Sequence, residues 1–174
     1  TPLFRSTLVQ DDINRLLVEL AKAGHSVVRL KGGDPTVFGR IGEELSALKE
    51  ANIPFEIVPG VTAGIAGPAY AGIPVTDRKR SSSVTFITGR EAMESPTPER
   101  LQTQGTLVIY MGMKTMGEMV GRLLEAGQET EVPVAVIQWA TRPEQRVVTG
   151  TLGTIVEQCN RENIGSPAII VVGD

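Results

Sequence analysis

The segment Lys31-Gly32-Gly33-Asp34-Pro35 combines residue types that suit ligand binding at the end of a strand. It directly follows the apolar run at residues 27–30, and in open α/β sheets ligands bind outside the carboxyl ends of the strands. Two glycines let a ligand approach the backbone because they carry no Cβ atom. Asp34 can accept hydrogen bonds from an amino group or a ribose hydroxyl. Asp34 and Pro35 suit the N-cap and first position of a helix equally well, so the spacing supports both a binding loop and a cap.

Three further segments place small or polar residues directly after an expected strand. Pro59-Gly60-Val61-Thr62-Ala63 follows residues 55–58, and its threonine suits a helix cap or a ligand contact. Tyr110-Met111-Gly112 follows residues 107–109, where a methionine is usually part of the core. The last segment, Gln138-Trp139-Ala140-Thr141-Arg142, holds the single tryptophan, which is typical of a core or an interface.

Several common classes of site lack their motifs in this sequence. No G-x-G-x-x-G follows an expected strand and no G-x-x-x-x-G-K-[ST] occurs, which argues against dinucleotide dehydrogenases and P-loop nucleotidases. One histidine, His25, and one cysteine, Cys159, are too few for a structural zinc site, so we expect no metal. A lone Cys159 on the apolar side of a helix is expected to be inert and favours a reducing compartment, the cytoplasm.

Charge and hydropathy point away from two classes of partner. The net charge of -3 at pH 7 gives no reason to expect nucleic acid. No apolar run approaches the roughly 20 residues that span a bilayer. We therefore expect neither a nucleic acid nor a membrane as partner.

Helices and strands alternate along the first half of the chain. Apolar residues recur at helical spacing over residues 11–23 and again through Ile41, Leu45 and Leu48. Small apolar residues predict a third helix over 61–71. With buried strands at residues 27–30 and 55–58, this alternation is typical of a parallel sheet covered by helices.

The alternation stops at residues 74–83, which are polar, basic and rich in serine, as in a linker. It resumes with strands expected at 84–88 and 107–111, a helix between Thr115 and Gly127, an antiparallel pair at 134–139 and 146–150, a helix after Thr154 and a strand at 168–172. We therefore predict an α/β fold with two domains, residues 1–80 and 81–174.

Together these segments resemble the tetrapyrrole methylases, and among them the uroporphyrinogen-III C-methyltransferase branch. The string Val28-Arg29-Leu30-Lys31-Gly32-Gly33-Asp34-Pro35-x-x-Phe38-Gly39-Arg40 and the string Val58-Pro59-Gly60-Val61-Thr62-Ala63 are similar to two family signatures. Ala69-Tyr70-Ala71-Gly72-Ile73-Pro74 extends the likeness toward that branch. Tyr110-Met111-Gly112, Arg142-Pro143-Glu144-Gln145-Arg146 and Ser166-Pro167-Ala168 continue it in order, so the likeness spans essentially the whole chain.

The resemblance implies a tetrapyrrole methylase-like fold, with two α/β domains, a cleft for S-adenosyl-L-methionine between them, and a homodimer. It implies methylation of uroporphyrinogen III at C-2 and C-7 to give precorrin-2 for siroheme and cobalamin biosynthesis, with S-adenosyl-L-homocysteine as the other product. The cofactor-binding residues that it implies are Gly32, Gly33, Asp34, Val37, Thr62, Ala63, Met111, Ala140 and Ala168.

Uroporphyrinogen III is a polycarboxylate, so we expect cationic side chains to bind it. The candidates are Arg40, Arg78, Lys79, Arg80 and Arg90, although the run at 78–80 suits an exposed linker equally well. S-adenosylmethionine is itself a strong electrophile, so the main task of such an enzyme is to position a pyrrole carbon. The sequence identifies no catalytic acid or base.

The opening strand and G-x-G-P-G-D-P-type loop of the family have no match in this sequence, so we expect an incomplete first domain. We also expect these residues alone to fold poorly or to bind the cofactor weakly. Two other functions stay open. The first is methylation of another acceptor, as in a precorrin methylase or a diphthine synthase-like methyltransferase. The second is a non-enzymatic module that binds S-adenosylmethionine or a tetrapyrrole. Tyr70-Ala71-Gly72-Ile73-Pro74 favours the uroporphyrinogen branch.

Overall fold

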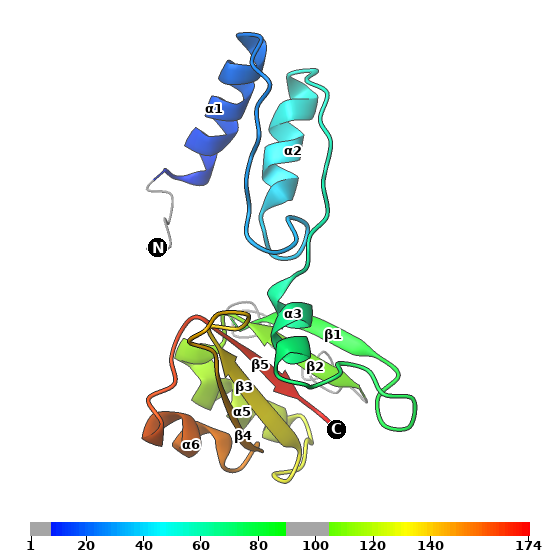
Figure 1. Cartoon of the computed structure of the whole chain (residues 1–174), viewed down its shortest axis with the longest axis vertical. Helices are drawn as coiled ribbons and strands as arrows, with labels where there is room; N and C mark the ends of the chain where they lie inside the picture. Colours follow the sequence, from blue (N-terminus) through cyan, green and yellow to red (C-terminus); the bar gives the residue numbers. More distant parts are fainter. Residues whose placement is uncertain (1–7, 90–104) are drawn as a thin grey trace. The chain divides into compact units, whose positions relative to one another are not determined.

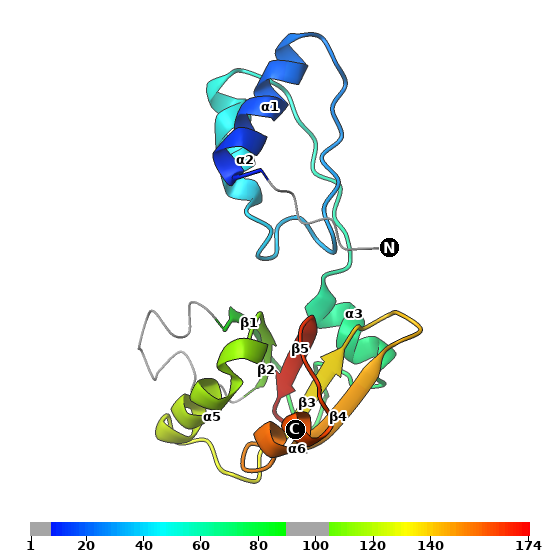
Figure 2. The same ribbon diagram turned by 90° about the vertical axis from the view of Figure 1, so that its left-hand side faces the viewer.

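The chain forms two compact units, Thr1–Thr62 and Ala63–Asp174. A computed structural model describes residues 8–89 and 105–174, shown from two directions in Figures 1 and 2. The sequence predicts a domain boundary near residue 80, yet helix α3 (Ala63–Tyr70) packs on strands β2 (Thr106–Tyr110) and β5 (Ala168–Val172). This packing places the boundary of the compact units at residues 62 and 63. The domain division at residue 80 stays a prediction.

Helices α1 (Gln10–Lys22) and α2 (Ile41–Glu50) confirm the two helices predicted before residue 60. Helix α1 has Asp11 and Asp12 in its first turn and a lysine in its last turn, which suits the helix dipole. The two helices pack against each other. No residue of α1 is fully buried, and Leu16 is 43% exposed, so the apolar stripe of α1 is only partly covered.

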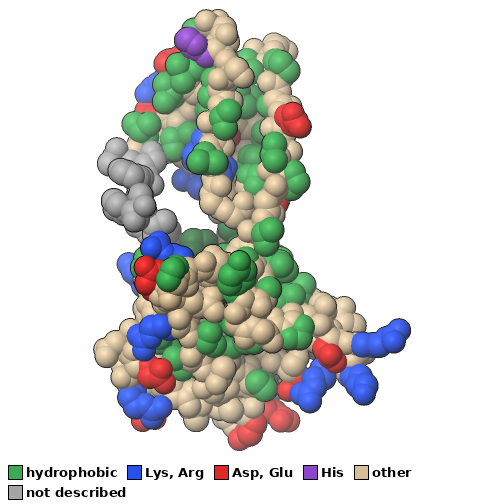
Figure 3. Space-filling view, viewed as in Figure 1, with side chains coloured by type: hydrophobic (Ala, Val, Ile, Leu, Met, Phe, Trp, Pro, Cys, Tyr) green, Lys and Arg blue, Asp and Glu red, His purple; other side chains and the backbone are tan. Residues whose placement is uncertain are grey.

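Residues 27–30 and 55–58 are not strands, so the prediction of two buried strands is wrong. Val28 and Leu30 are 85% and 84% exposed, and Val58 is 75% exposed. An extended segment becomes a strand only when a neighbour pairs with its backbone groups, and neither segment has such a neighbour among the described residues. Hydrophobic side chains are accordingly visible on the surface of the unit that carries α1 and α2 (Figure 3).

The second unit is built on a five-stranded mixed sheet with the order β1-β2-β5-β3-β4. The remaining strands are β1 (Val84–Thr88), β3 (Pro133–Gln138) and β4 (Arg146–Thr151). Strand β1 pairs in parallel with β2, whereas the β2–β5, β3–β5 and β3–β4 pairs are antiparallel. All five strands predicted in this part of the sequence are confirmed.

Helices cover both faces of this sheet (Figure 2). Successive residues of a strand point to opposite faces, so one strand packs side chains against the helices on both sides. Ile170 packs in the core formed with α5 (Met116–Glu125), which follows the short 3-10 helix η2 (Met113–Thr115), and with α6 (Ile155–Arg161). Ile169 faces the other way, toward Gly67 of α3. Cys159 of α6 is 1% exposed, which confirms the expected buried thiol.

The expected linker at residues 74–83 contains a tight turn that leads into β1. Asp77 and Ser81 form an isolated β-bridge, and Asp77 Oδ1 accepts hydrogen bonds from the backbone N–H groups of Lys79 and Arg80. Ser81 is buried, and its Oγ accepts a hydrogen bond of 2.9 Å from the N–H of Thr106. The turn is therefore attached to the first residue of β2.

Candidate functional site

Asp34 closes a turn and ties two loops together. Its Oδ1 accepts hydrogen bonds from the backbone N–H of Thr36, at 2.7 Å, and from the Thr36 hydroxyl. Its Oδ2 accepts a bond of 3.1 Å from the N–H of Gly60. The next helix begins only at Ile41, so the interpretation of Asp34 as a helix N-cap is wrong. Hydrogen bonds from Thr36, and then from Gly60, lower the pKa of Asp34, so the carboxylate stays ionised.

The two loops meet at a pair of glycines. A Cβ atom on Gly60 would lie 2.3 Å from the carbonyl oxygen of Gly33, so the approach requires glycine at position 60. Gly33 has φ +72°, a conformation that favours glycine. No atom lies within 4 Å of a Cβ placed on Gly32, which leaves this backbone open. The structure thus brings the predicted residues Gly32, Gly33 and Asp34 against the loop that leads to Thr62, with Val37 closing the turn through a 3.4 Å bond to the Asp34 carbonyl.

Glu44, which is not among the residues predicted from the sequence, anchors the start of this loop. Its side chain is 4% exposed, and its carboxylate oxygens lie 3.1 and 3.2 Å from Lys31 Nζ. Arg29 Nε and Gln10 Nε2 each lie 3.2 Å from Glu44 Oε1. Burial by itself raises the pKa of Glu44, but the hydrogen bonds from Lys31 and Gln10 and the two positive charges lower it below its usual value. In the sequence, Glu44 could have been found from its position on the otherwise apolar Ile41–Leu45–Leu48 face of the predicted helix.

In the second unit, three predicted site residues lie at one end of the sheet. Met111 directly follows β2, and Ala140 lies two residues after the end of β3. Ala168 begins the antiparallel strand β5 and pairs with Gln138, the last residue of β3. Met111 has φ +54° and is 51% exposed. A non-glycine residue in this strained conformation is often found at a functional site. Ala63, the fourth predicted residue, begins α3.

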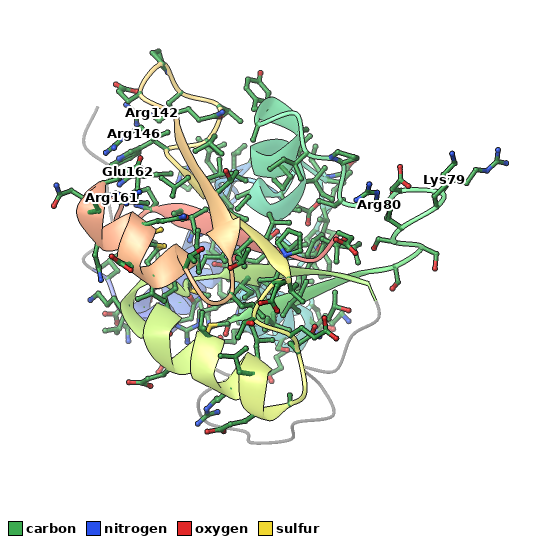
Figure 4. All side chains as sticks on the ribbon, turned by 90° about the horizontal axis from the view of Figure 1, so that it is seen from below. Lys79, Arg80, Arg142, Arg146, Arg161 and Glu162 are labelled. Atoms are coloured by element: carbon green, nitrogen blue, oxygen red, sulfur yellow. The ribbon has the colours of Figure 1, made fainter. Side chains whose placement is uncertain are left out.

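The three described cationic candidates of the second unit are not brought to this end of the sheet. Arg78, Lys79 and Arg80 lie in the Asp77–Ser81 turn, next to the first residue of β2, whereas Met111 follows its last residue. Figure 4 shows Lys79 extending away from the body of the unit, whereas Arg80 lines a pocket beside Ser81 and Gly105. Arg40, in the first unit, lies 2.7 Å from the Glu43 carboxylate. Arg90 lies outside the described residues.

Two arginines that are not among the predicted site residues, Arg142 and Arg146, do lie at the end of the sheet that carries Ala140. Arg146 begins β4 opposite Gln138. Its Nη2 donates a bond of 2.9 Å to the Glu162 carbonyl and lies 3.9 Å from the Glu162 carboxylate. The Arg142 guanidinium lies 5.0 Å from the centre of the Trp139 ring. Figure 4 shows both arginines on the side of the view opposite Lys79. In the sequence, both arginines could have been found from their position within and directly after the loop that follows the strand predicted at residues 134–139.

Two further observations concern the described residues of both units. Across residues 8–89 and 105–174, no three metal-ligating side chains gather in one place. No helix in the same part of the chain is long and apolar enough to cross a bilayer. The groups described above are open backbone, an ionised carboxylate and arginines, which are chemically able to bind and orient a ligand.

The mixed sheet, the glycine-rich loop pair and the ends of β2, β3 and β5 define a class of protein that the family comparison identifies. Residues 2–156 match the model of the Tetrapyrrole (Corrin/Porphyrin) Methylases, and the chain belongs to this family. This finding confirms the resemblance and the α/β fold class.

Individual relatives are similar over nearly the whole chain. It is 48% identical over 172 residues to a uroporphyrinogen-III C-methyltransferase of Bacillus subtilis, covering 97% of this chain and 67% of that protein. It is 49% identical over 176 residues to an S-adenosyl-L-methionine-dependent uroporphyrinogen III methyltransferase of Methanosarcina barkeri, covering 97% of this chain and 68% of that protein. The chain thus spans about two thirds of the length of these relatives.

A solved structure shows the same fold. The uroporphyrin-III C-methyl transferase of Thermus thermophilus, in complex with S-adenyl homocysteine, superposes with a TM-score of 0.81 at 34% identity, covering 95% of this chain and 73% of that one.

Proposed function

We propose that the protein is an S-adenosylmethionine-dependent methyltransferase that methylates uroporphyrinogen III at C-2 and C-7, giving precorrin-2 and S-adenosylhomocysteine. The observation that carries this proposal is the likeness to two relatives named for this reaction, at 48% and 49% identity over nearly the whole chain. The Thermus thermophilus structure supports the choice of cofactor, because that protein was crystallised with S-adenyl homocysteine.

The described loops fit S-adenosylmethionine chemically. The cofactor has two cationic groups and a ribose, and when bound it supplies an electrophilic methyl group. Asp34 presents an ionised carboxylate whose oxygens can accept further hydrogen bonds, and Gly32 exposes open backbone beside it. Met111 presents a half-exposed thioether side chain at a strand end. The residues that we propose as cofactor contacts are Gly32, Gly33, Asp34, Val37, Thr62, Ala63, Met111, Ala140 and Ala168.

The proposed acceptor carries several carboxylates, which arginine binds with paired hydrogen bonds. Arg142 and Arg146 are better placed for this role than residues 78–80, because they lie at the same end of the sheet as Ala140. Arg40 and Arg90 stay candidates. The work of the protein in this reaction is to hold a pyrrole carbon in line with the methyl group.

Two finer points belong to the same proposal. The family resemblance supports a homodimer, and analytical ultracentrifugation of the protein would show a single species of twice the chain mass. The buried, unpaired Cys159 supports a reducing compartment, the cytoplasm.

The test is an anaerobic assay with uroporphyrinogen III and S-adenosylmethionine, in which mass spectrometry counts the methyl groups added. We expect two per molecule of uroporphyrinogen III. If the protein methylated a later precorrin but not uroporphyrinogen III, it would be a precorrin methylase instead. Binding of S-adenosylhomocysteine without methylation of any tetrapyrrole would favour the non-enzymatic module.

A pair of variants tests the cofactor loop. Asp34→Ala should weaken S-adenosylhomocysteine binding by about tenfold or more, because a charge-assisted hydrogen bond is lost. Asp12→Ala is the control, since the Asp12 carboxylate pairs with the exposed Arg15 side chain, and this variant should bind as the parent does. Unchanged affinity in Asp34→Ala, together with lower stability, would assign Asp34 a purely structural role in its turn.

A further inference from the structure

The start of α3 is attached to the sheet by a buried tyrosine that no part of the proposed mechanism uses. The backbone N–H of Gly64 donates a hydrogen bond of 2.8 Å to Oη of Tyr110, the last residue of β2. Tyr110 is 8% exposed, and its ring packs with the Phe86 ring in a T-shaped arrangement, with 5.8 Å between centroids. The hydroxyl therefore has a defined place, and it satisfies an N–H group at the start of a helix, where intrahelical partners are lacking.

The contact is possible only because residue 64 is glycine. A Cβ atom there would lie 2.3 Å from Oη and 2.7 Å from Cζ of Tyr110, closer than any side chain tolerates. One turn further along α3, a Cβ on Gly67 would lie 3.4 Å from the Cβ of Ala140 and 3.9 Å from Ile169. Gly64 thus lets α3 lie directly on the end of β2, while Gly67 lies at ordinary contact distance from Ala140 and Ile169.

These contacts adjoin every proposed cofactor residue of the second unit. Ala63 precedes Gly64, and Met111 follows Tyr110 in the chain. Ala140 itself faces Gly67, and Ala168 precedes Ile169. Of these four residues only Ala63 belongs to α3, so the position of α3 on the sheet sets where Ala63 lies relative to Met111, Ala140 and Ala168.

We propose that Tyr110 and Gly64 are positioning residues, and that their hydrogen bond holds α3 where Ala63 and Met111 can both contact S-adenosylmethionine. This inference rests on the proposed function. The tyrosine hydroxyl takes no part in the chemistry. Its effect is on cofactor affinity, because a buried N–H that loses its partner favours a shift of the helix start.

Tyr110→Phe tests the hydroxyl while keeping the ring. We expect the dissociation constant for S-adenosylhomocysteine and the KM for S-adenosylmethionine to rise about tenfold, the usual scale for one buried hydrogen bond. The kcat at saturating cofactor and the KM for uroporphyrinogen III should change less than about twofold, because the reacting groups are unchanged.

Ser81→Ala is the matched control. It removes a buried side-chain acceptor of a backbone N–H at the opposite end of the same strand, β2. Both variants should lower the unfolding midpoint by similar amounts, but only Tyr110→Phe should weaken cofactor binding. Equal losses of affinity in the two variants would overturn the inference, because the effect would then follow stability alone.

Gly64→Ala tests the same contact without altering Tyr110, and it keeps the inference testable if Tyr110→Phe folds poorly. Its new methyl group must displace the tyrosine, so affinity should fall by at least about tenfold. Gly121→Ala, in α5, is its control, because no atom lies within 4 Å of the added methyl group and binding should not change. A parent protein that binds S-adenosylhomocysteine, with Tyr110→Phe and Gly64→Ala binding equally well, would refute this inference alone. A parent protein that does not bind it would refute the proposed function as well.

Discussion

Replacing Glu44 by glutamine removes the negative charge that holds Lys31 at the start of the glycine-rich loop. The side chain keeps its shape and one carbonyl acceptor, so the change isolates the charge. Lys31 is the principal partner, because its side chain is only 11% exposed, whereas the Arg29 side chain is 37% exposed. Removing one member of a buried ion pair costs about 3–5 kcal/mol. Because Arg29 is partly solvated, we expect Glu44→Gln to lower the stability of the first unit by less than the full range, about 2–3 kcal/mol.

Hydrogen exchange measured by mass spectrometry is the appropriate assay, because the single tryptophan, Trp139, lies in the second unit and does not report on α2. A loss of about 2–3 kcal/mol corresponds to roughly 30- to 150-fold faster exchange in peptides from α2, if α2 and the loop open together. Peptides from β2 and β5 should be unaffected.

Glu43→Gln is the matched control, one residue away on the same helix. Glu43 contacts Arg40 at the surface, with side chains 45% and 62% exposed, so its loss should cost less than about 1 kcal/mol. Equal exchange rates in α2 for the two variants would show that the buried carboxylate does not hold the loop, and the reasoning would be refuted.

Three further predictions concern pH, a close glycine contact and the buried thiol. The pKa of Glu44 is lowered on folding, so its stabilisation is complete above the usual value of 4.5 and is lost as the pH falls through the folded value. The protection of α2, measured as its exchange rate relative to the unfolded chain at the same pH, should therefore decrease below about pH 4.5 in the parent and less so in Glu44→Gln. Gly60→Ala should destabilise the loop pair by about 1–3 kcal/mol, because its methyl group meets the Gly33 carbonyl. Gly42→Ala, which has open space in α2, should instead stabilise the helix by up to about 1 kcal/mol, and denaturant titration of exchange would separate the two signs. Burial, and then the charge of Glu162, raise the pKa of Cys159, so a thiol reagent at pH 8 should modify the folded protein at least about a hundredfold more slowly than the denatured protein, and comparable rates would contradict the buried position.

The sequence by itself determined the features that depend on neighbours along the chain. Helical spacing of apolar residues located α1 and α2, and short apolar runs located the strands of the second unit. The family was also readable, because the glycine, aspartate and proline positions of its signatures lie in short unbroken strings. These signals are local, so they survive without knowledge of the fold.

Only the tertiary structure decided the features that depend on distant partners. Residues 27–30 have the composition of a strand but are exposed, since a strand also needs a neighbour for its backbone groups. Asp34 bonds to Gly60, and Glu44 to Lys31, across loops whose approach no spacing rule predicts. Helix α3 is assigned to the second unit because Gly64 fits against Tyr110, a pairing of residues 46 positions apart in the chain. In each case the deciding term is packing or hydrogen bonding between segments that only the folded chain brings together.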